Sequence, residues 1–363
     1  MNPRSNVKKA ANFNAIGAAT NPIATRQAME FFQSADGFLS NQDVALIRVP
    51  FKTGNLALLK SEYVNRDDVK LRSAGAAAEA EKATLGVGKV AYTTDSRGLE
   101  YILTADDAAQ IGYEYGMDVP GVVTKALGLK ANIHMEGRFA ALWASGSWYR
   151  TVTGAGSDSG TEGTTAMNRI KWSDATKDPS VAIRAEKRIF LIRTGKMPTN
   201  LRLGYRLFEY LATHPLIRAQ IALTVGGQST VAGFTPMATE AQLSQLWGIK
   251  VSTSYGVVNN SNVDGTPSNA LIVADGDALM TYDTSGNFQA NVGNVSGMAT
   301  VAMTESCGFA QVAWEGVAQS GFALREVPRP ELGAGGSQSW ILDLFRGYVI
   351  VDNTFGTYFS GMY

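Results

Sequence analysis

The chain has 363 residues, which is long enough for two domains. Its 32 basic and 32 acidic side chains balance, which excludes the basic excess of a nucleic-acid-condensing protein. Its single cysteine, Cys307, excludes an intrachain disulfide framework and a multi-cysteine metal site, and it is expected to be a small buried residue. No uninterrupted apolar run approaches the ~18 residues of a membrane span, and the polar N-terminus lacks the apolar centre of a secretory signal.

The first 43 residues are polar, locally basic and without a hydrophobic core. From residue 44 to 103 the pattern changes to extended runs, with strands expected at 44–49, 55–64 and 87–93. The last two runs flank a long polar stretch, 65–85, which has almost nothing to bury. This pattern predicts a protruding hairpin with a charged tip.

The charged residues of this tip are candidate contacts between copies of the chain. Single exposed ion pairs contribute only ~0–1 kcal/mol each, so repetition over many copies would have to supply the effect. These candidates are Arg66, Asp67, Asp68, Lys70, Arg72, Glu79, Glu81 and Lys82.

One long helix is predicted at about 119–144, within a segment that spans 104–174. Its apolar positions at near-helical spacing are Val119, Val122, Val123, Ala126, Leu129, Ile133, Ala140 and Trp143. Polar side chains expected on the opposite, solvent-facing side are Lys125, Lys130, Glu136 and Arg138. Leu129 and Ile133 are therefore expected to be core residues, and Glu136 is expected to face water.

The stretch from Trp172 to Pro215 is the most informative part of the chain. Asp178 is expected to cap a helix that begins at Pro179, because proline lacks only an amide hydrogen that would be unpaired there. Gly195 is expected to end that helix in the left-handed conformation. A short strand and a second helix follow, and the second helix ends at His214.

The remainder of the segment 175–336 is rich in turns and short strands, with a further helix expected from Glu240 to Trp247. The last 27 residues, 337–363, contain two β-like runs. The pattern predicts two strands joined at Arg346-Gly347.

In order and spacing, the pieces at 172–215 resemble the major capsid proteins of tailed bacteriophages, which share the Hong Kong 97 phage-type fold, an α+β fold. Members of that family often carry a Trp-x-Asp, Asp-Pro, helix, Gly-x-x-Pro-Asn, strand, helix, His-Pro series. Here Trp172, Asp178 and Gly195 occupy those places, while Thr199 separates the proline from the asparagine. The resemblance extends over about residues 45–363.

The resemblance implies a division of the chain into five parts. These are an N-terminal arm (1–43), an extended loop with flanking strands (44–103), a peripheral domain with the spine helix (104–174), an axial domain (175–336) and C-terminal strands that return to the peripheral domain (337–363). Small polar loops that contain Gln228 and Asn260 are expected near a symmetry axis of the shell, where rings of like charge would repel. Some family members join subunits by a lysine–asparagine isopeptide bond, for which Lys82 and Asn353 are the best placed candidates.

The resemblance also implies the partners of the chain. These are copies of itself in hexamers and pentamers, a separate scaffolding protein, a portal and a decoration protein, with packaged double-stranded DNA contacted only non-specifically and no membrane. The expected location is the virion, after assembly in the cytoplasm of a bacterial host.

Catalytic and metal-binding patterns are sparse in this sequence. The only two histidines, His134 and His214, lie on different predicted elements, so the chain has few residues that could form a zinc site or a Cys–His catalytic pair. The run Gly86–Val90 lacks the first glycine and the Ser or Thr of a phosphate-binding loop. We therefore expect no enzyme activity, cofactor or metal. The alternative is a soluble α+β enzyme or carbohydrate-binding module that uses the glycine-rich part of 175–336 as a ligand loop.

Overall fold

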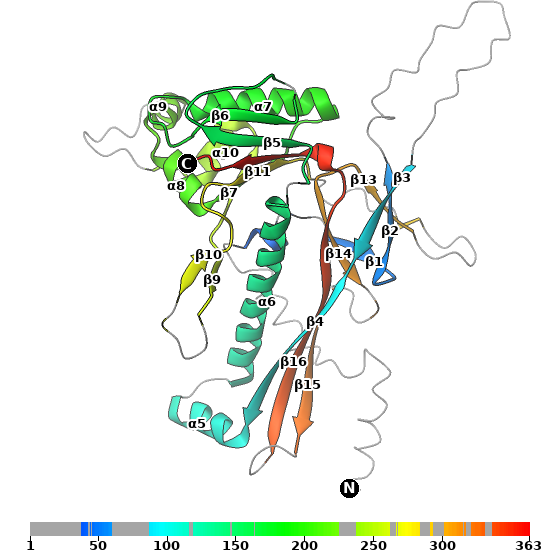
Figure 1. Cartoon of the computed structure of the whole chain (residues 1–363). Coiled ribbons are helices and arrows are strands. Elements are labelled where there is room, and N and C mark those ends of the chain that lie inside the picture. The colour runs from blue at the N-terminus through cyan, green and yellow to red at the C-terminus, as the bar shows by residue number, and fades with distance from the viewer. Residues whose placement is uncertain are drawn as a thin grey trace, which may run out of the picture.

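The molecule is elongated, with a helix-covered layer at one end and a long helix on a narrow sheet toward the other (Figure 1). The structure is a computed structural model. The residues that it describes are 38–42, 44, 46–59, 87–115, 119–145, 147–162, 164–224, 237–261, 266, 268–283, 291–292, 301–314, 316, 321–330 and 336–363.

The long helix α6 (Val119–Trp143) confirms the predicted spine helix. It packs against three strands, which are β4 (Asp95–Thr104), β15 (Phe322–Arg329) and β16 (Ser337–Ile350). We call α6 and these strands the spine layer. A short helix, α5 (Ala105–Tyr115), precedes α6, and Asp106 and Asp107 lie in its first turn, where acidic side chains favour the positive end of a helix.

The buried stripe of α6 differs from the predicted one. Its buried apolar residues follow each other at intervals of four: Val123, Leu127, Ala131, Met135, Phe139 and Trp143. Each interval of four residues turns the stripe by about 40° around a helix of 3.6 residues per turn. The stripe thus faces the spine-layer sheet over its first four members and a second cluster, which includes Trp148 and Phe309, over its last two.

The predictions for four residues of α6 are therefore wrong. Leu129 is 42% exposed and Val122 is 47% exposed, while Ile133 is only partly buried. Glu136, expected to face water, is completely buried. The prediction assumed one straight apolar face, whereas the helix contacts different partners at its two ends.

Residues 337–350 form one continuous strand, β16, where the sequence predicts two strands joined at Arg346-Gly347. Its first part pairs with β15 and β4, and its last part pairs with β14 (Phe309–Trp314). Gly347 lies inside the strand. A Cβ at this position would come 2.3 Å from the carbonyl oxygen of Thr93. This glycine permits a close backbone approach instead of a turn, which is a common reason for glycine within a strand.

A six-stranded sheet at the other end has the order β6-β5-β17-β11-β7-β8. Its strands are β5 (Arg150–Ala155), β6 (Ala166–Ile170), β7 (Asn200–Gly204), β8 (Lys250–Ser254), β11 (Ala278–Thr281) and β17 (Gly356–Ser360). The helices packed on it are α7 (Pro179–Thr194), α8 (Tyr205–Thr213), α9 (Pro215–Thr224) and α10 (Glu240–Trp247). We call this assembly the six-stranded layer, and α10 confirms the helix predicted at 240–247.

Strands of the six-stranded layer come from three of the predicted segments, since β5 and β6 precede residue 175 and β17 follows residue 336. The division into arm, loop, peripheral and axial domains at the predicted boundaries stays a prediction. The remaining elements are α3 (Leu39–Gln42), β1 (Leu46–Val49), β9 (Val257–Asn259), β10 (Asn269–Leu271), β12 (Asn291–Val292), β13 (Val301–Glu305) and η1 (Asn353–Phe355).

The base of the predicted hairpin is present as β2 (Thr53–Leu59) paired antiparallel with β3 (Val87–Thr93). Leu56 and Leu58 of β2 are buried against β1 and β14, so this base is anchored in the body of the molecule. The predicted tip, 65–85, lies outside the described residues.

Candidate assembly surfaces and their framework

The motif at 172–215 forms the local structure that the sequence predicts. Asp178 caps α7, and its Oδ1 accepts a hydrogen bond from the Ser180 amide at 2.9 Å. Its Oδ2 accepts a second bond from Gln220 Nε2 at 2.7 Å, which ties α7 to α9. Gly195 ends α7 with a φ of 70°, in the left-handed region where glycine has no Cβ penalty.

Replacement of Asp178 by alanine is expected to lower the free energy of unfolding by about 1–2 kcal/mol, because the cap and the bond to Gln220 are both lost. Urea denaturation of the subunit measures this change. The matched control is Asp174→Ala, which removes a partly exposed turn carboxylate and should cost less. Equal losses for the two variants would contradict the capping role.

Trp172 and His214 fasten the ends of this motif to the core. Trp172 is buried, its amide donates to the Met362 carbonyl at 2.7 Å, and its ring lies 5.1 Å from that of Phe359. The His214 amide donates to Leu211, as expected at a helix end, and its Nε2 lies 3.0 Å from the Asp174 carbonyl oxygen. Trp172 at the start of the motif is therefore held against the C-terminal residues, and His214 near its end is held against Asp174.

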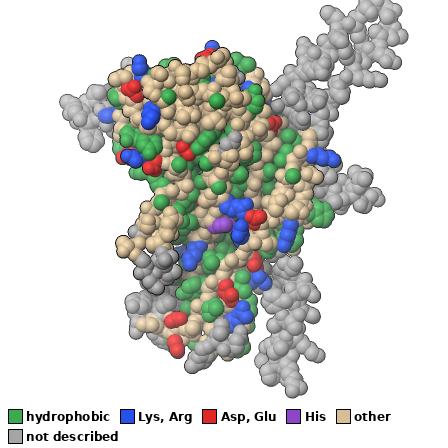
Figure 2. Space-filling view, viewed as in Figure 1, with side chains coloured by type: hydrophobic (Ala, Val, Ile, Leu, Met, Phe, Trp, Pro, Cys, Tyr) green, Lys and Arg blue, Asp and Glu red, His purple; other side chains and the backbone are tan. Residues whose placement is uncertain are grey.

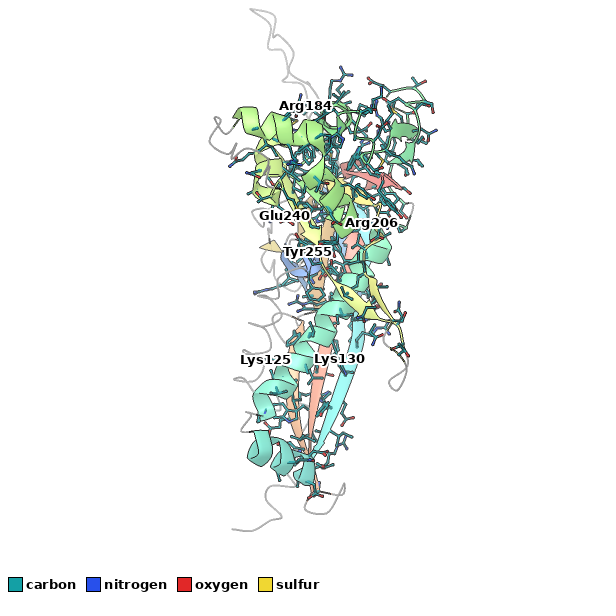
Figure 3. All side chains as sticks on the ribbon, turned by 90° about the vertical axis from the view of Figure 1, so that its left-hand side faces the viewer. Lys125, Lys130, Arg184, Arg206, Glu240 and Tyr255 are labelled. Carbon is teal, nitrogen blue, oxygen red and sulfur yellow. The ribbon has the colours of Figure 1, made fainter. Side chains whose placement is uncertain are left out.

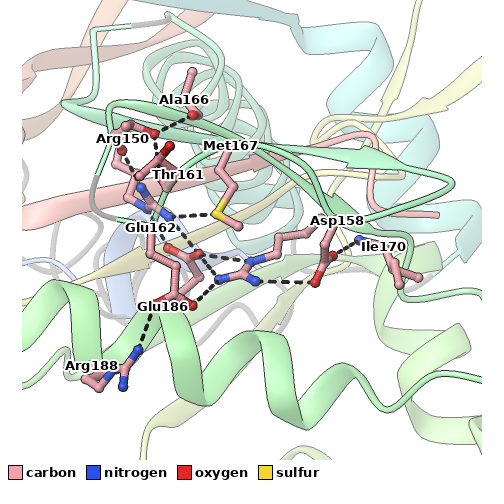
Figure 4. A network of polar contacts seen from close by, with 11 residues as sticks. Arg150, Asp158, Thr161, Glu162, Ala166, Met167, Ile170, Glu186 and Arg188 are labelled. Carbon is pink, nitrogen blue, oxygen red and sulfur yellow. Dashed lines mark hydrogen bonds and ion pairs between the residues drawn. The ribbon is translucent and has the colours of Figure 1, made fainter.

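Beneath α7, one buried carboxylate joins two buried arginines (Figure 4). Glu186 accepts hydrogen bonds from Arg150 at 2.6 and 2.9 Å and from Arg169 at 3.2 and 3.3 Å. Asp158 extends the network by accepting from Arg169 at 3.4 Å and from the Ile170 amide at 2.8 Å. The network therefore fixes α7 to β5 and β6.

A second buried network lies on β7 and β11. Arg202 donates to Asp283 Oδ2 and to Thr281 Oγ1, both at 2.7 Å. Asn200 donates to the same Asp283 oxygen at 2.8 Å. These bonds hold β7, β11 and Asp283, which lies two residues after β11, in fixed positions. Sequence reasoning did not identify them.

Apolar side chains are exposed on the outer surface of α7. Ile192 is 77% exposed and Val181 is 62% exposed, with Arg184 and Arg188 also on the exposed side of the helix. Because large exposed apolar residues on one helix mark an interaction surface more often than isolated ones do, we call Val181, Leu191 and Ile192 the α7 patch.

A second exposed face includes aromatic and charged side chains of the six-stranded layer and the lysines of α6 (Figure 3). Tyr255 donates from its hydroxyl to Glu240 at 3.1 Å, and its ring lies 5.5 Å from that of Tyr205. The Arg206 guanidinium lies 5.1 Å from the Tyr363 ring. Tyrosine and arginine are enriched at protein–protein interfaces, so this face is a second candidate contact surface.

Charges of both signs are dispersed over the face in Figure 2, among hydrophobic and neutral side chains. This agrees with the equal numbers of acidic and basic residues in the chain. A strong field of one sign, of the kind that steers a nucleic acid, is not evident on that face.

His134 lines a cavity of about 570 Å³ between α6, β9 and β16, together with Lys130, Arg138, Val258 and Tyr348. Burial, and secondarily the charge of Arg97, lower the pKa of His134 below its usual value. Within the described ranges, no group of three His, Cys, Asp or Glu side chains is arranged to hold a metal ion. No helix in the described part of the chain is long and apolar enough to cross a membrane.

The structure describes only part of the predicted contact set. Arg66, Asp67, Asp68, Lys70, Arg72, Glu79, Glu81, Lys82 and Gln228 lie outside the described residues. Asn260 is exposed just after β9, and its amide donates to the Ser268 carbonyl at 2.9 Å. Asn353 is exposed in η1, while its proposed partner Lys82 is among the undescribed residues, so their bond stays a prediction.

Solved structures of other proteins align with most of this chain. A phage-related protein from Bordetella bronchiseptica RB50 superposes with a TM-score of 0.63 at 14% identity, covering 95% of this chain and 98% of its own. A virus-like particle from Pyrococcus furiosus gives 0.49 at 7% identity, with coverages of 93% and 98%. The mature capsid of bacteriophage PhiM1 gives 0.48 at 9% identity, with coverages of 88% and 86%.

No protein-family model and no curated protein matches the chain. At 14% identity, the likeness to the Bordetella protein shows the fold alone. The mixed helices and strands confirm the predicted α+β class, and the chain shares its fold with the Bordetella phage-related protein.

Proposed function

We propose that this chain is a shell-forming subunit, the major capsid protein of a tailed bacteriophage. Copies of it would assemble into pentamers and hexamers of an icosahedral head that encloses double-stranded DNA. The observation that carries the proposal is the α7 patch on a chain with this fold, because it exposes large apolar side chains that a second copy could cover.

The anchoring of the α7 patch supports an interface role. The helix that carries it is fixed by the Asp178 cap at one end, by Gly195 at the other and by the Glu186 network beneath. A rigidly held surface loses little conformational entropy when a partner binds. The same stretch carries the sequence motif that resembles the capsid family.

The remaining parts of the proposal concern partners and place. The tip residues between Arg66 and Lys82 would contact neighbouring copies, and Gln228 and Asn260 would lie near a symmetry axis. A scaffolding protein, a portal and a decoration protein would complete the head, whose wall would contact DNA only non-specifically. The chain would be assembled in the bacterial cytoplasm, would reside in the virion and would have a structural rather than an enzymatic role.

The double variant Val181→Asp with Ile192→Asp is expected to reduce particle yield at least ten-fold, because two carboxylates would be buried without partners when copies meet. Electron microscopy and sedimentation velocity measure the yield, and circular dichroism verifies that the subunit remains folded. The matched control, Val181→Leu with Ile192→Leu, retains an apolar surface and should assemble normally.

Particles at normal yield from the aspartate variant would exclude the α7 patch as an assembly contact. Wild-type chain that remains monomeric both alone and with a phage scaffolding protein would contradict the shell-forming role itself.

A further inference from the structure

Glu136 lies in the middle of α6 and is completely buried. Its Oε2 accepts a hydrogen bond from the Ser40 amide at 2.8 Å, and its Oε1 accepts one from Ser254 Oγ at 2.7 Å. One carboxyl group therefore joins three separate elements, namely α3, α6 and β8.

Residues 38–40 cover this carboxyl group from one side. Phe38, Leu39 and Ser40 are all buried, and the Ser40 carbonyl accepts a hydrogen bond from the Tyr348 hydroxyl at 2.9 Å. Phe38 Cε1 and Glu136 Cγ would each lie 3.3 Å from a Cβ placed on Gly256, so the side chains pack closely around that glycine. Removal of residues 38–40 would open Glu136 to water.

The groups that face Glu136 are uncharged. Ser40 on α3 and Ser254 on β8 are neutral donors, and burial raises the pKa of Tyr348 on β16, so that this phenol is neutral as well. Arg346 of β16 interacts electrostatically with Tyr348. Burial lowers the pKa of Arg346 to about 10, so its guanidinium retains its charge. The described residues provide no ion pair for Glu136.

A buried carboxylate without a cation is strongly disfavoured relative to its protonated form. Burial accordingly raises the pKa of Glu136 above its ordinary 4.5, and the hydrogen bonds from Ser254 and Ser40 oppose this effect. Both bonds can persist after protonation. The carboxyl C=O would accept from the Ser40 amide, and the O–H would donate to Ser254 Oγ, because a serine hydroxyl accepts as well as donates.

We propose that residues 38–42 dock over Glu136 together with one proton from solvent, so that docking is tight in mildly acidic solution and loosens as the pH rises. When the segment is undocked, Glu136 is exposed to water and ionises in its ordinary range. Docking is therefore fully favoured below the undocked pKa and weakens as the pH rises through the higher docked pKa. Because residues 38–42 lie at the end of the predicted N-terminal arm (1–43), the consequence for assembly rests on the proposed function.

Hydrogen exchange of the full-length subunit, followed by mass spectrometry between pH 5 and pH 8, tests the proposal. After correction for intrinsic exchange, opening of residues 38–42 in the wild type should increase with pH, by up to about ten-fold for each unit by which docking raises the pKa. Glu136→Gln should remove this dependence and keep the segment closed at pH 8. Its amide can still accept from Ser40 and donate to Ser254, as the protonated acid does.

The matched control is Glu209→Gln, which neutralises an exposed carboxylate on α8 and should retain the wild-type pH profile. Two results would overturn the proposal: a wild-type profile that does not change with pH, or a Glu136→Gln variant that opens at every pH because the anion itself is required. Particle yield at pH 5 and pH 8 is a separate readout. Failure of all variants to form shells while the exchange profile follows the expectation would count against the proposed function and support the role of Glu136.

Discussion

Replacement of Glu186 by alanine is expected to lower the free energy of unfolding by about 3–5 kcal/mol, because it leaves buried positive charge uncompensated. Glu186 is completely buried, and Arg150 and Arg169, which it joins, are buried as well. The loss extends to Arg193 on the same helix. Burial, together with the charge of Arg150, already lowers the pKa of Arg193 to about 10, and Glu186 opposes that effect.

Urea unfolding of the subunit, followed by circular dichroism, measures the effect of Glu186→Ala. The matched control in the same network is Glu162→Ala, since Glu162 is exposed and pairs with the exposed Arg188 at 2.7 Å. That change should cost only about 0–1 kcal/mol. A loss of less than about 1 kcal/mol for Glu186→Ala would mean that water reaches the two arginines and that the network does not hold α7.

The sequence allowed prediction of the elements whose signals are local. The cap at Asp178, the left-handed Gly195 and the helix at 240–247 depend on neighbouring residues, and the structure confirms all three. The spine helix was also predicted almost to its ends. Each of these depends on interactions within a few residues, which a single sequence contains.

Interactions between distant segments were not predictable in the same way. Glutamate is a charged residue that usually faces solvent, so the sequence indicates an exposed Glu136. It is a buried acceptor only because Ser40 and Ser254, 96 and 118 residues away in the sequence, approach it. Gly347 suggested a turn because the sequence does not show that the backbone of Thr93 passes beside it. The pairing of Glu186 with Arg150 and Arg169 likewise depends on the arrangement of α7 over β5 and β6.

The candidate contact surfaces were also predictable only in part. The charged residues between Arg66 and Lys82 were selected because a polar stretch between two strands has nothing to bury. By contrast, the α7 patch was not selected, because Val181 and Ile192 are apolar and fit any buried helix. Only the observed exposure of these side chains distinguishes an interface from a core.

Replacement of Phe139 by alanine is expected to cost about 3–5 kcal/mol, because it removes the aromatic side chain where α6 meets β14 and β16. Phe139 is fully buried, with its ring 5.0 Å from that of Phe309 and 5.3 Å from that of Tyr348. The Arg202 guanidinium lies 5.4 Å from the same ring, so the cavity would also weaken the contact between α6 and the Asp283 network.

Leu129→Ala on the same helix provides the comparison, and it separates folding from assembly. Leu129 is 42% exposed in the subunit, so its truncation leaves no internal cavity and should cost less than about 1 kcal/mol in urea unfolding. If copies of the chain cover this side of α6, Leu129→Ala should instead reduce particle yield while the subunit keeps its stability. An equal loss of unfolding free energy for Leu129→Ala and Phe139→Ala would contradict the observed helix orientation. It would mean that Leu129 belongs to the core and that the buried residues form one straight face.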